Sequence, residues 1–227
     1  PGKGMINLAR LGVVLDQITE EYQLDAMALR CWIEIQQQLG ISPCVLVSEM
    51  NNRGAACACE VDVSSAVTMA VLQAASDSVV TNLDWNNNYG QEVSKCILFH
   101  CGPVPQNLMT EKGKVVDHEL LIPALGSGCS WGCNVGRIRP MDMTFCGMKT
   151  MNGQLQFYIG EGRFTNDPIP NNFFGCAGVA EIPGLQTVLR TIGIQGHRHH
   201  TCIVEGHVAD VVSEALERYL NCEVTRV

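Results

Sequence analysis

The stretch VDVSSAVTMAVLQAASDSVVTNLDW, from Val61 to Trp85, joins a helical pattern directly to a strand pattern. Residues 61–76 contain no Gly or Pro and are rich in Ala and other apolar residues, so they predict a helix that either Asp62 or Ser64 can cap. Residues 78–85 then read as a strand that ends at Asp84. A helix followed at once by a strand indicates α/β architecture.

The residues before this stretch continue the alternation of helix and strand. The predicted elements are a helix over 6–23, a strand over 24–32, a short helix over 33–40 that ends at Gly40, and a helix between Pro43 and Gly54. With the strand-like run over 55–60 and the strand over 78–85, this part has about three strands, which are too few for a complete doubly wound sheet. We therefore expect residues 1–88 to be the C-terminal part of a Rossmann-like α/β domain.

The sequence pattern changes after residue 88. Helical periodicity gives way there to short β-like runs that are separated by Gly, Pro and Asn. Asn152-Gly153 lies between two such runs and predicts a hairpin. Many short strands joined by turns indicate an antiparallel barrel or sandwich. We expect residues 89–227 to form an antiparallel β-barrel-like domain with a final helix over 208–220. The runs are residues 95–102, 117–123, 137–149, 154–165, 175–182 and 199–207.

The amino-acid composition excludes some classes of partner and indicates the cellular compartment. A net charge of -8, with only 15 basic residues, argues against nucleic acid as a partner. No run reaches the roughly 18 apolar residues of a membrane span, and the start has no secretory pattern, so we expect a cytoplasmic protein with no membrane partner. The 12 cysteines sit mostly singly in apolar runs without paired zinc-ribbon spacing, which favours free, buried thiols over disulfides or structural zinc.

Four strand-like runs carry a metal-capable side chain at one end. Glu60 closes an apolar run that predicts burial, Asp84 and His100 each end a run, and His199 and His200 open another. Mixed oxygen and nitrogen ligands suit Mn²⁺ or a similar divalent ion. Each residue alone also fits a plainer role, as a turn former, a helix cap or a hydrogen-bonded core histidine.

Two segments carry a resemblance to a known family. CWIEIQQQLGISPCVLVSEMNNRGAACACEVDVSSAVTMAVLQAASDSVVTNLDW, with acids at Glu60 and Asp84 around a helix, resembles the L-fucose isomerase and L-arabinose isomerase superfamily. HHTCIVEGHVAD, residues 199–210, resembles the late motif of that superfamily, in which a histidine ligand precedes Gly-His and a helix start. The resemblance implies an aldose–ketose isomerase that depends on a divalent metal, usually manganese.

Carried over residue by residue, the resemblance implies a role for each motif residue. Glu60 and Asp84 match the acidic metal ligands, and His200 matches the histidine ligand. His100 falls where the arabinose isomerase branch has a further histidine ligand. His199 is a candidate sugar contact, as is Trp85 beside Asp84. In addition we expect His207 to orient the final helix, and we assign no role to His197.

The chemistry fits these residue types. Aldose–ketose isomerisation moves a proton between C1 and C2 through an enediol, and a divalent ion can polarise the carbonyl while a carboxylate carries the proton. Glu60 and Asp84 are the acids placed for both tasks. We expect a monosaccharide substrate and a homo-oligomer, a trimer or hexamer in the full-length form.

Members of the superfamily have further α/β domains before the matching region, so we expect this chain to be a C-terminal piece with little activity alone. Two other functions stay open. The first is a metal- or carbohydrate-binding module without turnover. The second is a Cys-rich structural zinc protein, which the cysteine spacing disfavours.

Overall fold

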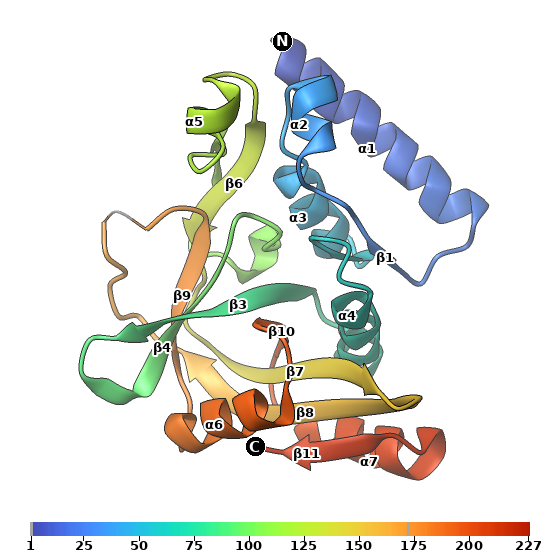
Figure 1. Cartoon of the computed structure of the whole chain (residues 1–227), viewed down its shortest axis with the longest axis vertical. Helices are drawn as coiled ribbons and strands as arrows, with labels where there is room; N and C mark the ends of the chain where they lie inside the picture. The colour runs from blue at the N-terminus through green and yellow to red at the C-terminus, as the bar shows by residue number, and fades with distance from the viewer. Residues whose placement is uncertain (1, 172) are drawn as a thin grey trace.

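The computed structural model describes residues 2–171 and 173–227 (Figure 1). Its N-terminal part is α/β, as the sequence predicts. Strands β1 and β2 form a small parallel sheet in which Ala26 pairs with Ala56 and Ala28 with Ala58. The elements of this part are α1 (Lys3–Glu21), β1 (Ala26–Ala28), α2 (Glu34–Leu39), α3 (Cys44–Asn52), β2 (Ala56–Ala58) and α4 (Val63–Ser76).

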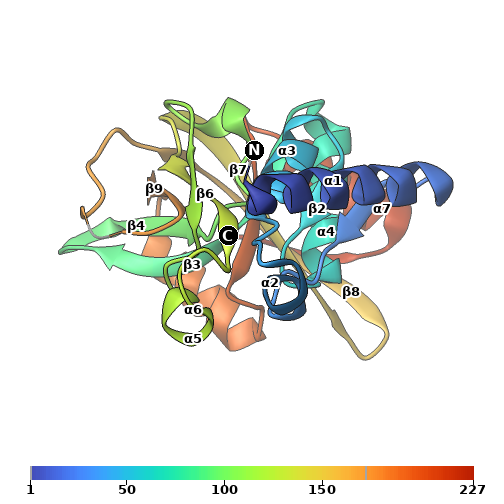
Figure 2. The same ribbon diagram turned by 90° about the horizontal axis from the view of Figure 1, so that it is seen from above.

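Local signals set the boundaries of these elements. Gly40 ends α2 in the left-handed region, with φ of 66°, a conformation that suits glycine. Asp62 caps α4 by accepting a hydrogen bond from the backbone N–H of Ser65 at 3.1 Å. Helix α1 packs along α3 (Figure 2), where Leu15 joins Val47 and Met50 in one apolar cluster.

The second part is a large, mostly antiparallel sheet in the order β11-β8-β7-β10-β3-β4-β9-β6-β5. Because β8 also pairs with β9, at Arg163–Glu181 and Phe164–Ala180, six strands come round into a nearly closed ring. The prediction of a mainly antiparallel sheet is confirmed, but the nearly closed ring is not a clear barrel. The strands are β3 (Val80–Tyr89), β4 (Glu92–His100), β5 (Lys114–Asp117), β6 (Trp131–Arg137), β7 (Met141–Met151), β8 (Gln154–Phe164), β9 (Cys176–Glu181), β10 (His200–Glu205) and β11 (Glu223–Arg226).

Several sequence predictions need correction. The strand predicted over 78–85 is β3, which joins the large sheet, so the small sheet has two strands instead of three. The run 117–123 holds the short helix α5 (Ile122–Leu125), and the run 137–149 is divided between β6 and β7. A helix that the pattern did not reveal, α6 (Leu185–Gln195), follows β9. The remaining elements are the 3₁₀ turn η1 (Gln106–Leu108) and α7 (Ala209–Leu220).

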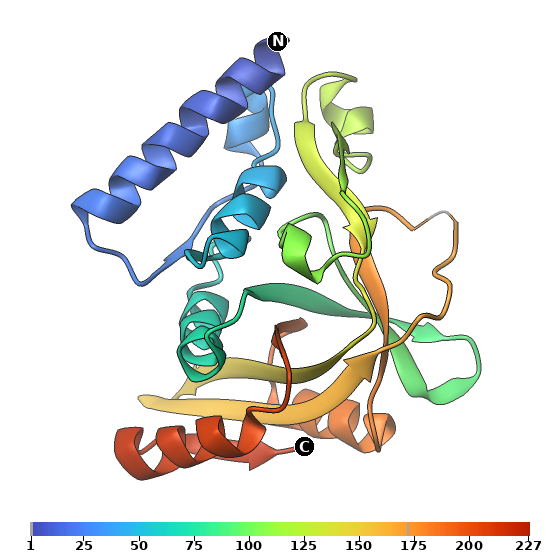
Figure 3. The ribbon, with the colours of Figure 1, turned by 180° about the vertical axis from the view of Figure 1, so that it is seen from behind.

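Two predictions about turns and helices are confirmed. Asn152 and Gly153 form the two-residue turn between β7 and β8, with φ of 51° and 78°, as the Asn-Gly signal predicts. The final helix, expected over 208–220, is α7, which lies along the outside of the sheet beside β11 (Figure 3).

The central strands of the large sheet bury apolar residues on both faces, and because side chains alternate along a strand, adjacent residues enter different clusters. On β7, Phe145 belongs to the cluster that α6 covers, whereas its neighbour Cys146 belongs to the cluster under α4 and α7. Ile203 and Val204 divide in the same way on β10. This packing fixes β10 between β3 and β7, with His200 opposite Asp84. Among the helices in the described residues, none is long and apolar enough to cross a membrane.

Candidate metal centre

Three adjacent strands and the end of β2 bring the predicted site residues together. His200 at the start of β10 pairs with Asp84 on β3, and Asp84 pairs with Phe99, the neighbour of His100, on β4. Glu60 follows β2, directly before the turn into α4. The cluster therefore lies where the small α/β part meets the large sheet.

His200 is at the centre of the cluster. Its Nε2 atom lies 3.6 Å from Oε2 of Glu60 and 3.3 Å from Oδ1 of Asp84. His199 reaches the same oxygen of Asp84 from the solvent side, with its Nε2 at 3.4 Å. Ligand atoms of Glu60, His100 and His200 lie within 4.8 Å of one another, and so do those of Asp84, His199 and His200. Both groups are compact enough to hold an ion.

A buried carboxylate behind His200 fixes its ring. Nδ1 of His200 lies 2.8 Å from Oδ2 of Asp62, and Arg198 donates to the other oxygen of Asp62 at 2.7 Å. Burial would lower the pKa of His200, but the hydrogen bond to Asp62 and the carboxylate of Asp84 raise it to about 9. Burial would likewise raise the pKa of Asp62, but its hydrogen bonds with His200 and Ser65 hold it below its usual range. The sequence marks Asp62 only as a helix cap, because its partner His200 lies 138 residues later in the chain.

The donor set fits a divalent ion. Within the part of the chain that the structure describes, Nε2 of His200 and Oδ1 of Asp84 are buried and lie 3.3 Å apart, at ion-pair distance but without hydrogen-bond geometry. Buried polar atoms usually form well-aligned hydrogen bonds in folded proteins, so this loose pair suits a shared ligand. Two carboxylates and an imidazole held from behind by Asp62 are a mixed oxygen and nitrogen set of the kind that Mn²⁺ accepts.

His100 takes part differently from His200. The backbone N–H of Cys101 donates to Nδ1 of His100 at 2.9 Å. Burial lowers the pKa of His100 to about 4, so its ring is neutral, and with Nδ1 as an acceptor the proton is on Nε2. A protonated Nε2 donates a hydrogen bond and does not bind a metal. This geometry favours a donor role over the ligand role that the sequence suggests.

Glu60 differs from its predicted environment. The sequence predicts a buried carboxylate, but the Glu60 side chain is 34% exposed. The reason is the backbone, which turns at Glu60 and Val61 with φ of 63° and 57°. The turn carries the carboxylate out of the apolar run that precedes it.

Three other residues named from the sequence lie outside the cluster. Trp85 points to the opposite side of β3 from Asp84, where its indole N–H donates to Tyr158 at 3.1 Å and its ring packs against Phe145. His197 packs edge-on against Tyr158. His207 contacts Glu161 at 3.0 Å, and Glu161 in turn accepts the backbone N–H of Ala209 at the start of α7.

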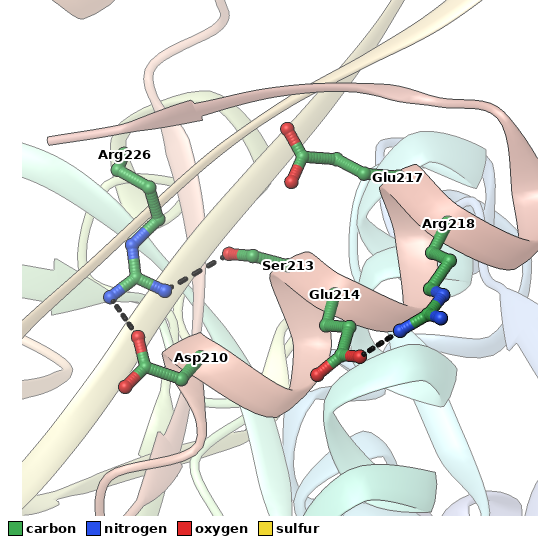
Figure 4. Close-up of a pocket in the computed structure, with 6 residues that line it drawn as sticks. All are labelled: Asp210, Ser213, Glu214, Glu217, Arg218 and Arg226. Carbon is green, nitrogen blue, oxygen red and sulfur yellow. Dashed lines mark hydrogen bonds and ion pairs between the residues drawn. The ribbon is translucent and has the colours of Figure 1, made fainter.

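A separate pocket between α7 and β11 contains none of the cluster residues (Figure 4). Four of its five charged groups pair with each other, since Arg226 contacts Asp210 at 2.7 Å and Arg218 contacts Glu214 at 3.0 Å, and Glu217 is the fifth. Among the residues that the structure describes, the pocket holds no histidine or cysteine and no mixed set of donors suited to a metal ion. The candidate site is therefore the cluster around His200.

Comparison with known proteins identifies the family of this chain. Residues 98–227, more than half of the chain, match the family described as L-fucose isomerase, C-terminal domain. The chain belongs to this family. The match includes His100, His199 and His200, whereas Glu60 and Asp84 precede it.

Curated relatives also match. The sulfoquinovose isomerase of Priestia megaterium (strain ATCC 12872 / QMB1551) is 26% identical over 94 residues, which are 41% of this chain and 21% of that protein. The sulfoquinovose isomerase of Alkalicoccus urumqiensis is 29% identical over 96 residues, 42% of this chain and 21% of that protein. The aligned part is thus about a fifth of the length of these relatives.

Proposed function

We propose that this chain supplies the metal centre of an aldose–ketose isomerase, with Glu60, Asp84 and His200 holding Mn²⁺ or another divalent cation. One observation carries the proposal. The buried Nε2 of His200 faces carboxylate oxygens of Glu60 and Asp84 at 3.6 and 3.3 Å, while Asp62 holds the other side of the ring. The family and the sulfoquinovose isomerases supply the reaction class.

The cation and the carboxylates would have different roles in the reaction. When bound, the cation polarises the carbonyl of the sugar. Glu60 has the more exposed carboxylate of the pair, at 34% against 20% for Asp84, so Glu60 reaches an incoming sugar more readily. Glu60 would take the proton from one of the two carbons, C1 or C2, and return it to the other through the enediol, with Asp84 as the second candidate.

Two neighbouring groups can contact the sugar oxygens. His199 is 66% exposed on the solvent side of Asp84, where it can contact a hydroxyl group. His100 presents a buried Nε2–H, which can donate to an oxygen. The sugar contact expected for Trp85 requires the indole to leave Tyr158, so we assign Trp85 a supporting role in this proposal.

In this proposal the substrate is a monosaccharide. The protein would act as a homo-oligomer in the cytoplasm. The competing function is a metal- or carbohydrate-binding module without turnover. The exposure of Glu60 and His199 favours this alternative for the chain in isolation, since an open site does not exclude water.

Metal binding gives the first test. Mn²⁺ is titrated into the chain and into His200→Gln, with free Mn²⁺ followed by electron paramagnetic resonance. His207→Gln is a matched control, because His207 also lies near two carboxylates, Glu161 and Asp142, but outside the cluster. We expect His200→Gln to bind Mn²⁺ at least about tenfold more weakly and His207→Gln to bind it normally. Equal affinity in both variants would refute the site.

Turnover is a separate measurement. Ketose formation is followed with Mn²⁺ and L-fucose, D-arabinose, L-arabinose or sulfoquinovose, using this chain and a version extended at its N-terminus. Conversion of any of these sugars that is lost in Glu60→Gln supports the isomerase. Mn²⁺ binding without conversion in either version would favour the binding module.

A further inference from the structure

A pocket of about 500 Å³ lies at the edge of the large sheet and includes none of the residues of the His200 cluster. Strands β5, β6 and β9 are neighbours in the sheet and supply one wall, whereas residues 168–171 and Phe173, from the loop before β9, supply another (Figure 1). Three basic side chains line this pocket, in a chain whose net charge is -8. They are Lys112, Lys114 and Arg137.

The sheet register places two of these basic side chains next to each other. Lys114 on β5 pairs with Val135 on β6, and Arg137 is two residues further along β6, so Lys114 and Arg137 lie on the same face. They are diagonal neighbours across an antiparallel pair, a spacing that long side chains can bridge. Lys112 lies in the segment that leads into β5. Side chains in this arrangement can contact a common anion in the pocket.

The positive charges of the pocket have no carboxylate partner among the residues that the structure describes. No ion pair there involves Lys112, Lys114 or Arg137, whereas Arg139 and Arg163, outside the pocket, each contact a glutamate at 2.5 Å. Exposed lysines are often only solvated, and Lys112 and Lys114 are exposed. The stronger observation is therefore Arg137.

Arg137 is partly buried and weakly bound. Its guanidinium donates to the backbone carbonyl of Asp167 at 3.4 Å, a long hydrogen bond. The carboxylate of Asp167 does not neutralise it, because that group lies 2.9 Å from the ammonium of Lys95. Burial lowers the pKa of Arg137, which shows that its charge is partly removed from water. A desolvated charge is costly unless it is paired, so Arg137 suits an anion from outside the chain.

We propose that this pocket binds the phosphate group of a small phosphate monoester. The three positive charges meet one acidic residue, Glu111, among the described residues that line the pocket, so an excess of two positive charges remains. A phosphate monoester carries about 1.5 to 2 negative charges at pH 7, which matches that excess. The planar guanidinium of Arg137 can donate two parallel hydrogen bonds to phosphate oxygens, and the lysines add point charges.

The size and apolar lining of the pocket favour an ester over inorganic phosphate. Its volume of about 500 Å³ falls within the range of about 300–1,000 Å³ that is typical of small-molecule sites. Val135, Ile169 and Phe173 contribute apolar surface beside the basic groups. This surface can cover the carbon skeleton of the ligand while the basic groups hold its phosphate.

Calorimetric titration with glycerol 3-phosphate tests the pocket, with glycerol and inorganic phosphate as comparison ligands. The metal-free chain, Arg137→Gln and Lys114→Gln are compared with Arg190→Gln, which removes the same charge from an exposed position on α6 outside the pocket. We expect Arg137→Gln to bind at least about tenfold more weakly, since a hydrogen bond to a charged group contributes about 1.5–3 kcal/mol, and Arg190→Gln to bind normally. Equal affinity in these two variants would overturn the proposal, as would binding of glycerol as tight as that of its phosphate. Binding of inorganic phosphate without the ester would overturn the assignment to a monoester.

A second measurement uses the unmodified chain and so does not depend on the folding of variants. Arginines are modified with phenylglyoxal, with and without glycerol 3-phosphate, and the products are mapped by mass spectrometry. Protection of Arg137 but not of Arg10 and Arg190 supports the pocket, and equal modification of Arg137 with and without the ligand contradicts it. The proposal is independent of the isomerase proposal, because His200→Gln should lose Mn²⁺ binding and keep the binding of glycerol 3-phosphate.

Discussion

Nδ1 of His200 lies 2.8 Å from Oδ2 of Asp62, and this buried pair ties the start of β10 to the N-terminus of α4. Asp62 performs two tasks, because its other oxygen accepts the backbone N–H of Ser65 and caps the helix. A carboxylate behind a ligating histidine fixes the ring and its tautomer, and raises the basicity of the nitrogen that faces the metal. The pair therefore aims Nε2 of His200 at Glu60 and Asp84.

The substitution Asp62→Asn separates these two tasks. Asparagine caps helices about as well as aspartate, so α4 should stay folded. The charge that fixes His200 is lost, and we expect Mn²⁺ affinity to fall about 10- to 100-fold. Ser65→Ala is the control, since it removes only the hydroxyl contact to Asp62 at 2.7 Å. Titration with Mn²⁺ and a thermal melt of each variant check the prediction, and a melt that collapses with unchanged affinity would show that Asp62 is only a cap.

The stability of the metal-free chain should depend on the protonation of His200. Its pKa is raised from 6.5 to about 9 in the folded state, so its ion pair with Asp62 stabilises the fold fully below pH 6.5 and less as pH rises to about 9. The contribution is at most about 3 kcal/mol, since one pKa unit corresponds to about 1.4 kcal/mol. Because Mn²⁺ competes with this proton, Mn²⁺ affinity should rise over the same interval.

Denaturant unfolding in a chelator measures this dependence. His100 and His197 act in the opposite direction below pH 6.5, because burial lowers the pKa of each to about 4. The difference in unfolding free energy between the unmodified chain and His200→Gln removes their effect. That difference should shrink between pH 6.5 and 9, and a difference that stays constant would contradict the ion pair.

His100 should tolerate a substitution that His200 does not. The N–H of Cys101 occupies Nδ1 of His100, which leaves a proton on Nε2, and the amide group of glutamine can donate from a similar position. We expect His100→Gln to bind Mn²⁺ within a few-fold of the unmodified chain. The ¹⁵N chemical shifts of the His100 ring report the tautomer directly. A proton found on Nδ1, together with a loss of Mn²⁺ binding in His100→Gln, would restore the ligand role that the sequence suggests.

Local signals account for much of what the sequence predicts correctly. Gly40 ends a helix, Asp62 begins one and Asn152-Gly153 turns a hairpin because each of these effects depends on a few neighbouring residues. The pairing of β3 is different. Val80 to Asp84 face Val204 to His200 on β10, more than a hundred residues later, and no local pattern of β3 identifies that partner.

The same limit applies to the site. Strand-end positions select Glu60, Asp84 and His200 as metal-capable residues, and the structure brings all three together. The sequence does not predict the contact of Asp62 with His200, because the role of helix cap already accounts for an aspartate at this position. The sequence also does not predict the outward turn at Glu60. The apolar run before Glu60 indicates burial, whereas the positive φ occurs at the junction between β2 and α4.

The openness of the centre leads to the last prediction, which is that this chain alone binds Mn²⁺ but converts sugars slowly. Glu60 and His199 are 34% and 66% exposed, so water has access to the groups that would move the proton and hold the sugar. Holding a substrate in a reactive orientation can lower a barrier by about 7–11 kcal/mol, and an open centre provides little of this. The check compares ketose formation per bound Mn²⁺ in this chain with that in the N-terminally extended version. We expect a rate at least about a hundredfold higher in the extended version, since each factor of ten is only about 1.4 kcal/mol of barrier. Equal rates per bound Mn²⁺ would show that the open centre is already sufficient for turnover.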